Sequence, residues 1–328
     1  METIHKTIEN AYKVLDGKEL GYNEILDIVN LPGDAVLDLI SLAHKVTKKF
    51  AGPNHVCTIM NAKSGKCSQN CKFCAQSGFY DTDIETYPLK TEKDFLEKAE
   101  ETYKTGVKNF GLVTSGKGYF DPKDKEFIDI INAIDKIKAK YPDMHVCASI
   151  GILNRETAKV LADHKIKHYN INFQTAPSRY NDLISTTHTL EDRISTIKYL
   201  TEFGVKVCCG GIIGLGETME ERIEMALAIK ELNVDVIPLN VLIPIKGTPL
   251  ENMAPTPIFE IAKTFAIFRL INPSTIIKFA AGRETKLKDF QALLMLSGAN
   301  GFLTGGYLTT RGRDVEEDKI FEIELNKF

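Results

Sequence analysis

The sequence predicts an α/β fold, a (β/α)8 barrel of the TIM type with an N-terminal helical extension. Three observations predict it. From residue 55 onward short β-branched runs alternate with longer amphipathic stretches, the alternation continues for about eight units without a long linker, and 43% of the 328 residues are apolar. We therefore expect a helical extension over residues 1–50, a barrel over 51–310 and a charged C-terminal tail over 311–328, outside the barrel.

The N-terminal extension is predicted from helical periodicity. Apolar residues recur at intervals of three and four in GYNEILDIVN and DAVLDLISLAHKVTKKF, where Asn23 and Asp34 are the expected caps. We expect these helices to cover part of the barrel.

Eight segments are expected to form the barrel strands. They are VCTIMNA (56–62), KNFGLVTS (108–115), HVCASI (145–150), HYNINFQ (168–174), VKVCCGGII (205–213), VDVIPLN (234–240), TIIKFAA (275–281) and GFLT (301–304). The stretches between them have a helical period, as in DKEFIDIINAIDKIKAKYP. Because the active site of such a barrel forms at the carboxyl ends of its strands, unusual residues there are candidate functional residues.

Charge and cysteine content narrow the function classes. The formal net charge of −3, with both signs interspersed, provides no basic stripe for nucleic acid. No apolar run approaches the roughly 20 residues that cross a bilayer, and no cleavable leader is visible, so we expect a cytoplasmic protein without a membrane partner. Seven cysteines, an odd number, indicate thiolate chemistry in a reducing compartment rather than a disulfide framework.

Three of these cysteines, Cys67, Cys71 and Cys74, lie in GKCSQNCKFCAQS, on the loop that follows the first expected strand. Their Cys-x3-Cys-x2-Cys spacing lets three thiolates converge on one metal centre. A cubane iron-sulfur cluster held by three thiolates keeps one iron open to a small-molecule ligand. From the spacing alone the alternative is a zinc site that takes its fourth ligand from His55 or His145.

This motif, with the aromatic Phe73 before its last cysteine, resembles that of the radical S-adenosylmethionine (SAM) superfamily, in which SAM chelates the open iron. Six segments in order narrow the resemblance to the biotin synthase family. They are SGKCSQNCKFCAQS, HYNINFQTAP, VKVCCGGIIGLGET, IPLNVLIPIKGTPL, FAAGRE and SGANGFLTGGYLTT. The resemblance implies sulfur insertion into dethiobiotin to form biotin, a 4Fe-4S cluster with SAM, an auxiliary iron-sulfur cluster as sulfur donor, a flavodoxin or ferredoxin-type electron donor, and a homodimer.

Polar residues alternate with apolar ones along HYNINFQ, which places His168, Asn170, Asn172 and Gln174 on one face of the strand. The resemblance implies that Asn170 contacts the ureido ring of the substrate and that Asn172 and Gln174 contact SAM. The family commonly has Asp where this chain has Gln174. The alternative is a buried hydrogen-bond network without a ligand.

Four further residues are candidates with an ordinary structural alternative. Gly210 and Gly211 allow backbone amides to approach a cofactor, or form a tight strand-to-helix turn. Arg193 resembles a partner of the SAM carboxylate, although such residues are often solvated helix residues. Asn240 resembles a substrate-contacting position, or is a turn residue before Pro244.

The other four cysteines lie in expected strands. Cys57, Cys147 and Cys208 come from strands one, three and five, and alternate strands of a barrel contribute side chains to the same layer. Three inward thiolates would suit a second cluster, whereas simple core packing is the alternative. Cys209 should face away from Cys208, unless a bulge at the following glycines turns it inward as a possible further ligand.

The familiar biotin synthases hold an auxiliary 2Fe-2S cluster with three cysteines and one arginine. By resemblance Cys147, Cys208 and Arg283 match three of these ligands, with Arg283 placed to bias the cluster electrostatically. Gly111 stands where the family has its other cysteine, and Cys57 is additional. We therefore hypothesise a four-iron auxiliary cluster whose remaining iron carries an extra sulfide, with the two-iron cluster as alternative.

Two other functions stay open at this point. One is a radical SAM enzyme of similar fold that needs no sulfur donor and tolerates loss of the strand cysteines. The other is a zinc-stabilised binding module, which would be colourless, whereas iron-sulfur clusters are brown and oxygen-sensitive.

Overall fold

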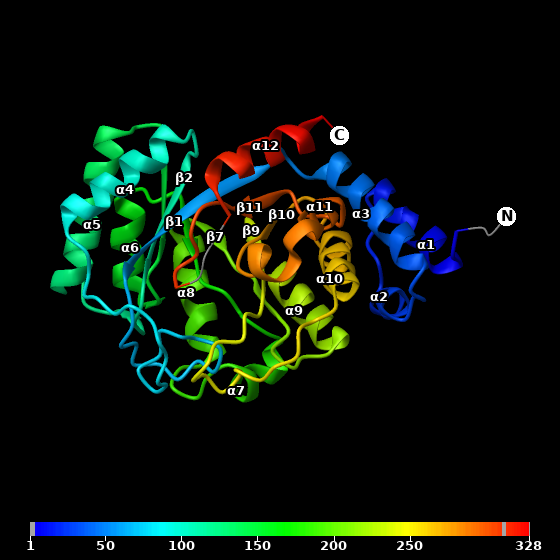
Figure 1. The fold of residues 1–328 in the computed structure, drawn as a ribbon, viewed down its shortest axis with the longest axis horizontal. Coiled ribbons are helices and arrows are strands. Elements are labelled where there is room, and N and C mark those ends of the chain that lie inside the picture. Colours follow the sequence, from blue (N-terminus) through cyan, green and yellow to red (C-terminus); the bar gives the residue numbers. More distant parts are fainter. Residues whose placement is uncertain (1–3, 310–312, 328) are drawn as a thin grey trace.

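The computed structural model describes residues 4–309 and 313–327. In this part of the chain, eight parallel strand positions form a closed barrel (Figure 1). The strands are β1 (His55–Lys63), β2 (Asn109–Thr114), β4 (His145–Ser149), β6 (His168–Asn170), β7 (Lys206–Cys208) with its continuation β8 (Gly211–Ile213), β9 (Val236–Val241), β10 (Ile276–Phe279) and β11 (Gly301–Leu303). The predicted (β/α)8 barrel is confirmed.

The barrel closes through two pairings. β10 pairs with β9, and β1 pairs with β11, where His55 lies opposite Gly301 and Cys57 opposite Leu303. A separate small sheet joins β3 (Gly118–Tyr119) and β5 (Ile152–Leu153) in parallel. Because all barrel strands run the same way, the cysteine loop that follows β1 lies at the carboxyl end of the barrel.

The fifth strand position is interrupted. β7 and β8 both pair with β9, with Cys208 opposite Val236 and Gly211 opposite Leu239, and two residues separate the segments. A Cβ atom on Gly210 would lie only 2.0 Å from the carbonyl oxygen of Pro238, so the close approach of the two strands requires glycine. The single predicted strand over 205–213 is therefore two short strands around a kink.

Helices cover the outside of the barrel (Figure 1). They are α4 (Glu92–Lys104), α5 (Lys125–Lys140), α6 (Arg155–Asp163), α7 (Tyr180–Leu183), α8 (Leu190–Glu202), α9 (Met219–Glu231), α10 (Ile258–Ile271), α11 (Gln291–Leu296) and α12 (Val315–Asn326). Thr91, Thr189 and Thr218 begin α4, α8 and α9 with capping boxes, in which the threonine hydroxyl accepts from the third helical amide. Short 3-10 and π turns complete the set, at Tyr12–Asp16, Pro177–Arg179, Arg283–Leu287 and Lys288–Phe290.

The N-terminal extension consists of α1 (Lys6–Ala11), α2 (Tyr22–Val29) and α3 (Ala35–Phe50), which pack beside α9 and α10 (Figure 1). Asp34 caps α3 as predicted, with its carboxylate 3.0 Å from the amide of Ala35. The predicted cap Asn23 is wrong, because α2 already begins at Tyr22.

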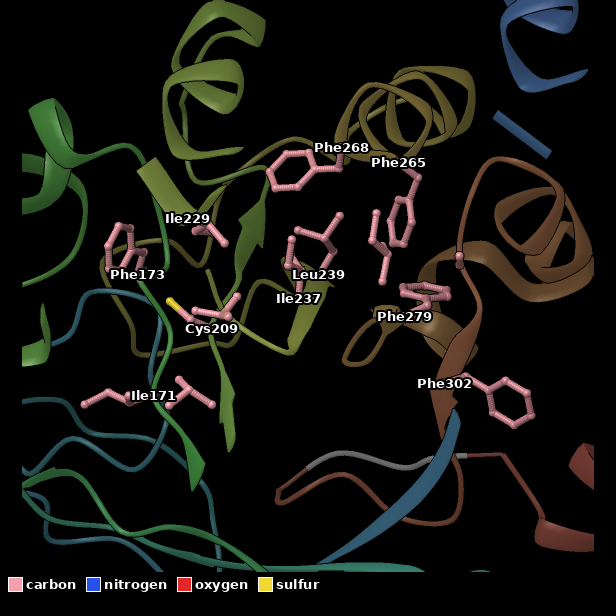
Figure 2. Close-up of a cluster of buried hydrophobic side chains, with 14 of the residues drawn as sticks. Ile171, Phe173, Cys209, Ile229, Ile237, Leu239, Phe265, Phe268, Phe279 and Phe302 are labelled. Carbon is pink, nitrogen blue, oxygen red and sulfur yellow. The ribbon is translucent and has the colours of Figure 1, made fainter. Parts of the chain in front are cut away.

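The core lies between the strands and the helices around them. Figure 2 shows part of it, in which Phe265 and Phe268 of α10 face Ile237 and Leu239 of β9. Phe265 also makes an edge-on ring contact with Phe279 of β10, with centroids 5.6 Å apart.

The C-terminal segment differs from the expected tail. Helix α12 lies against the barrel wall, where Phe321 contacts the ring of Phe302 on β11 with centroids 5.8 Å apart. Its Asp318 is 2% exposed and pairs with Arg283. A buried ion pair and a ring contact therefore make residues 315–326 part of the barrel rather than a tail outside it.

Candidate active site

One cavity of about 300 Å³ occupies the interior of the barrel, and both sets of cysteines line it. Cys67, Cys71 and Cys74 come from the loop at the carboxyl end of the strands. Cys57, Cys147 and Cys208 come from β1, β4 and β7, deeper in the barrel. Polar residues of the segment 168–174 line the wall between the two sets.

The cysteine loop is fixed by its own backbone and by a distant segment. The amide of Cys67 donates to the carbonyl of Gln76 at 2.9 Å. The side-chain oxygen of Asn70 accepts hydrogen bonds from Ser185 Oγ at 2.7 Å, from the Thr186 amide at 3.0 Å and from Thr187 Oγ1 at 3.1 Å. Sequence reasoning missed Asn70, because more than a hundred residues separate it from these partners.

Burial disfavours free thiolates in this loop. Burial raises the pKa of the Cys74 thiol to about 12, with a further contribution from Cys71. Burial also raises the pKa of Cys71, although nearby Arg193 acts in the opposite direction. Two thiols that are costly to ionise alone, on a loop that carries a third cysteine, fit a cationic metal centre that makes thiolates favourable.

Arg193 belongs to this end of the cavity. It lies on α8, and its guanidinium donates to the hydroxyl of Tyr180, to the carbonyl of Asn172 at 3.0 Å and toward His188 Nε2 at 2.9 Å. These contacts hold the cation beside the cysteine loop. It is not the solvated helix residue that was the ordinary alternative.

The predicted alternation of the segment 168–174 is observed. Tyr169, Ile171 and Phe173 are buried in the core, whereas the polar residues between them line the cavity. Regular strand geometry ends at Asn170, so the later polar residues lie beyond β6. Asn170 Nδ2 donates to Ser149 Oγ at 3.3 Å, a neighbour that sequence reasoning did not identify.

The side-chain oxygens of Asn172 and Gln174 differ in their hydrogen bonding within the protein. Asn172 Oδ1 accepts from the Gly210 amide at 3.1 Å, which ties it to the kink of the fifth strand. Gln174 has a φ of +74°, and its side-chain Oε1 is buried without a hydrogen-bond partner among residues 4–309 and 313–327. A buried acceptor without a partner, in the wall of a cavity, fits a ligand that donates a hydrogen bond there.

The glycines next to these residues serve close packing. Gly210 meets β9 as described above, and the Gln174 carbonyl accepts from the amide of Ile212 at 2.8 Å. On Gly211 a Cβ atom would lie 2.3 Å from Met225 Sδ. These contacts explain both glycines by chain packing, and neither glycine lines the cavity.

The side chain of Asn240 forms hydrogen bonds with other residues of the protein. Its Nδ2 donates to the Gly211 carbonyl at 3.0 Å, and its Oδ1 accepts from the Ala281 amide at 2.9 Å and from Tyr307 Oη at 3.3 Å. The side chain lines the cavity, but its main contacts link β9 to its neighbours. Its arrangement is that of a positioning residue.

The deeper cysteines gather around a lysine. Lys278, on β10, is 6% exposed and donates from Nζ to Cys57 Sγ at 3.0 Å. Burial lowers the pKa of Lys278, but the sulfurs of Cys57, Cys208 and Cys147 outweigh it, so the net direction is upward. Burial raises the pKa of Cys147 as well, and that of Cys208 to about 12.

Two sequence-predicted ligands lie elsewhere. Arg283 is not beside these cysteines: it follows Gly282, whose φ of +86° turns the chain out of the barrel, and its guanidinium donates to Asp318, Gln291 and the Leu303 carbonyl. Cys209 is fully buried in the apolar core of Figure 2, facing away from the cavity. The cation at the three cysteines is Lys278, which sequence reasoning missed.

A zinc site is not supported. His55 begins β1 and His145 begins β4, so both histidines lie at the amino end of the barrel, opposite the end that carries the cysteine loop. No group of three or more His, Cys, Asp or Glu within residues 4–309 and 313–327 is arranged to hold a single metal ion. A cluster spreads its thiolates over several metal ions, so this finding does not apply to it.

Comparison with known proteins agrees with the geometry. Residues 62–229 match the radical SAM superfamily, and residues 238–324 match the biotin and thiamin synthesis associated domain. The barrel with its cysteine loop is thus that of a radical SAM enzyme. The chain is 55% identical to biotin synthase of Chlorobium limicola over 99% of this chain and 98% of that protein, and 53% identical to biotin synthase of Chlorobaculum tepidum over the same shares. The chain belongs to the biotin synthase family and is a radical SAM sulfur-inserting enzyme.

Solved structures show the same fold at low identity. Methylornithine synthase is 19% identical with a TM-score of 0.80, and the alignment covers 96% of each chain. The FeFe-hydrogenase maturase HydG from Carboxydothermus hydrogenoformans is 18% identical with a TM-score of 0.80, over 98% of this chain and 78% of that chain. Among the described residues no helix is long and apolar enough to cross a membrane.

Proposed function

We propose that this chain inserts sulfur into dethiobiotin to form biotin, with SAM held at the cysteine loop and the sulfur held at the three strand cysteines. The observation that carries the proposal is the single cavity lined by both cysteine sets. A substrate in that cavity lies between the two sites and out of bulk water. When bound, the cluster at the loop supplies the electron that cleaves SAM to a 5′-deoxyadenosyl radical, and the second cluster supplies the sulfur.

The residues at the loop end have separate proposed tasks. Cys67, Cys71 and Cys74 hold the 4Fe-4S cluster, because they are three cavity-lining thiols on one loop. Arg193 offers a fixed positive charge to the SAM carboxylate. Gln174 supplies its unpartnered Oε1 to a SAM hydroxyl or amino group, and Asn172, which Gly210 already engages, positions that wall.

For the substrate we propose Asn170, with Ser149 beside it, as the group that binds the ureido ring. A carboxamide offers both a donor and an acceptor, which matches the N–H and C=O groups of a cyclic urea. Asn240 supports the same wall through its bonds to the backbone of β8 and of residue 281.

For the auxiliary site we propose a four-iron cluster held by Cys57, Cys147 and Cys208. Three thiols and one ammonium surround this part of the cavity, and the arginine of the two-iron alternative is bound to Asp318 instead. Gly111, opposite Cys147 on β2, lines the cavity at the same level. We also propose a cytoplasmic homodimer reduced by a flavodoxin or ferredoxin-type donor, by analogy with the family.

The test is anaerobic incubation with SAM, a reductant and dethiobiotin, with biotin detected by mass spectrometry. We expect biotin and 5′-deoxyadenosine together. If 5′-deoxyadenosine forms without any sulfur-containing product, the chain is a radical SAM enzyme without sulfur insertion. Iron analysis of the same protein distinguishes a four-iron from a two-iron auxiliary cluster. Two four-iron clusters give about eight irons per chain, whereas one four-iron and one two-iron cluster give about six.

A further inference from the structure

A buried ammonium group lies at the centre of the barrel. Lys278 extends from β10 into the cavity, is 6% exposed, and has Cys57 Sγ at 3.0 Å as the one hydrogen-bond partner shown in the described residues. Cys57, Cys147 and Cys208 line the cavity with it, and no Asp or Glu of the described residues does. A buried cation is unfavourable unless an anion lies beside it, so this lysine requires negative charge in the cavity.

The ammonium cannot be a metal ligand itself. A protonated lysine has three N–H donors and no lone pair. One donor is directed to Cys57, which leaves two for something else in the cavity. The imidazoles of His55 and His168 line the same region but carry no negative charge to offer. Three cysteines, moreover, leave one iron of a four-iron cluster without a protein ligand.

We propose that Lys278 binds the exchangeable sulfur of this site, by donating hydrogen bonds from its ammonium to a sulfide or hydrosulfide anion at the position that the three cysteines leave open. This inference rests on the proposed function, since it assigns a residue to the sulfur that the auxiliary site would donate. The ligand class is a small sulfur anion. A neutral side chain of similar length would remove both its charge and its donors.

The experiment compares three variants of the anaerobically reconstituted, full-length protein. K278M removes the ammonium and keeps a similar volume, whereas K278R keeps the charge and the donors. K263M is the matched control, because Lys263 is also partly buried but donates to the carbonyls of Val29 and Leu31, far from the cysteines. Iron and acid-labile sulfide are counted per chain, and isotope-labelled sulfide is added to follow its uptake by native mass spectrometry.

We expect about nine labile sulfides for about eight irons in the wild type, in K278R and in K263M, with uptake of labelled sulfide. K278M should keep about eight irons, lose about one sulfide and take up little label. K278M with the wild-type sulfide excess and uptake would overturn the proposal, and so would loss of irons together with sulfide, since Lys278 would then stabilise the cluster instead of the anion. A wild type with about six irons refutes the four-iron site of the proposed function itself.

Discussion

Arg283 and Asp318 form a buried ion pair that fastens helix α12 to the loop after β10. The guanidinium and carboxylate side chains are 5% and 2% exposed, and Arg283 Nη1 lies 2.8 Å from Asp318 Oδ1. The arginine also donates to Gln291 and to the Leu303 carbonyl. Its contacts therefore join the loop, the strand β11 and the last helix.

Replacement of one partner of this pair should destabilise the protein strongly. R283M leaves the buried Asp318 with only the more distant Arg313, at 3.8 Å, as a cationic partner, and should cost up to about 3–5 kcal/mol of unfolding free energy. Urea denaturation of the metal-free protein measures it. As a control, K159M removes one side of the exposed Lys159–Asp163 pair and should change stability by less than about 1 kcal/mol. Wild-type stability of R283M, combined with loss of auxiliary iron, would instead place Arg283 at the cluster.

The neighbouring cysteines of the fifth strand provide a matched pair of variants. C208A should remove a cluster ligand and lower the iron content of the auxiliary site. C209A should keep full iron content, because its side chain is fully buried in the apolar core, and should lower stability by about 1 kcal/mol. Iron analysis and urea denaturation measure the two effects. Equal iron loss in both variants would contradict the assignment of Cys208 as a cluster ligand and of Cys209 as a core residue.

Asn70 should control how well the cysteine loop holds its cluster. N70L removes the acceptor for Ser185, Thr186 and Thr187, so the loop loses three of its hydrogen bonds to that segment and is held less firmly. We expect slower cluster incorporation at the loop, with unchanged iron at the auxiliary site. N70D keeps the acceptor oxygen and should retain most of the incorporation, as followed by iron content and visible absorbance. If N70L incorporates its clusters at the wild-type rate, the attachment is not needed.

Replacement of Gln174 should weaken the binding of SAM without lowering the stability of the protein. Q174L removes an acceptor that has no partner in the described part of the chain, so the stability of the unliganded protein should not fall. The affinity for SAM should fall about tenfold, the effect of about 1.4 kcal/mol for one lost hydrogen bond. Anaerobic equilibrium dialysis measures it. Unchanged affinity would remove Gln174 from the SAM site.

Asn240 should behave as a structural residue. N240A leaves two backbone groups between β9, β8 and residue 281 without their partner, which should cost about 2–4 kcal/mol of unfolding free energy. Y307F removes the longer hydrogen bond to the same side chain and keeps both backbone partners of Asn240, so it should cost less than N240A. A stable N240A protein with weakened dethiobiotin binding would show that Asn240 acts directly on the substrate.

The sequence predicts the barrel well because strand and helix periods are local properties. The expected strands agree with the observed ones to within a few residues at most ends, and the alternation along 168–174 correctly places Ile171 and Phe173 in the core. The kink at Gly210 was foreseen only as an optional bulge, because it depends on how closely the Pro238 carbonyl approaches.

The residues whose positions were predicted wrongly or missed have one thing in common: their positions depend on contacts or turns that the local sequence pattern does not show. Arg283 was assigned to the auxiliary cluster because of its sequence motif. Lys278, five residues earlier, is the residue whose side chain lines the cavity. Gly282 lies between them and turns the chain out of the barrel before Arg283. A lysine within the apolar run TIIKFAA was the available signal. The burial of Asp318 could not be predicted, since a charge is buried only where its partner lies, and that partner is distant in the sequence.

The pairing of β1 with β11 also constrains how the protein is made. On its other edge β1 pairs with residues 301–303, so during synthesis the barrel has an open seam until these residues have left the ribosome. The seam borders the strand that carries Cys57 and gives access to the future interior. Iron and sulfide can thus be delivered either through the open seam of a nascent chain or through the mouth of a finished barrel, and maturation timed by pulse labelling would distinguish the two routes.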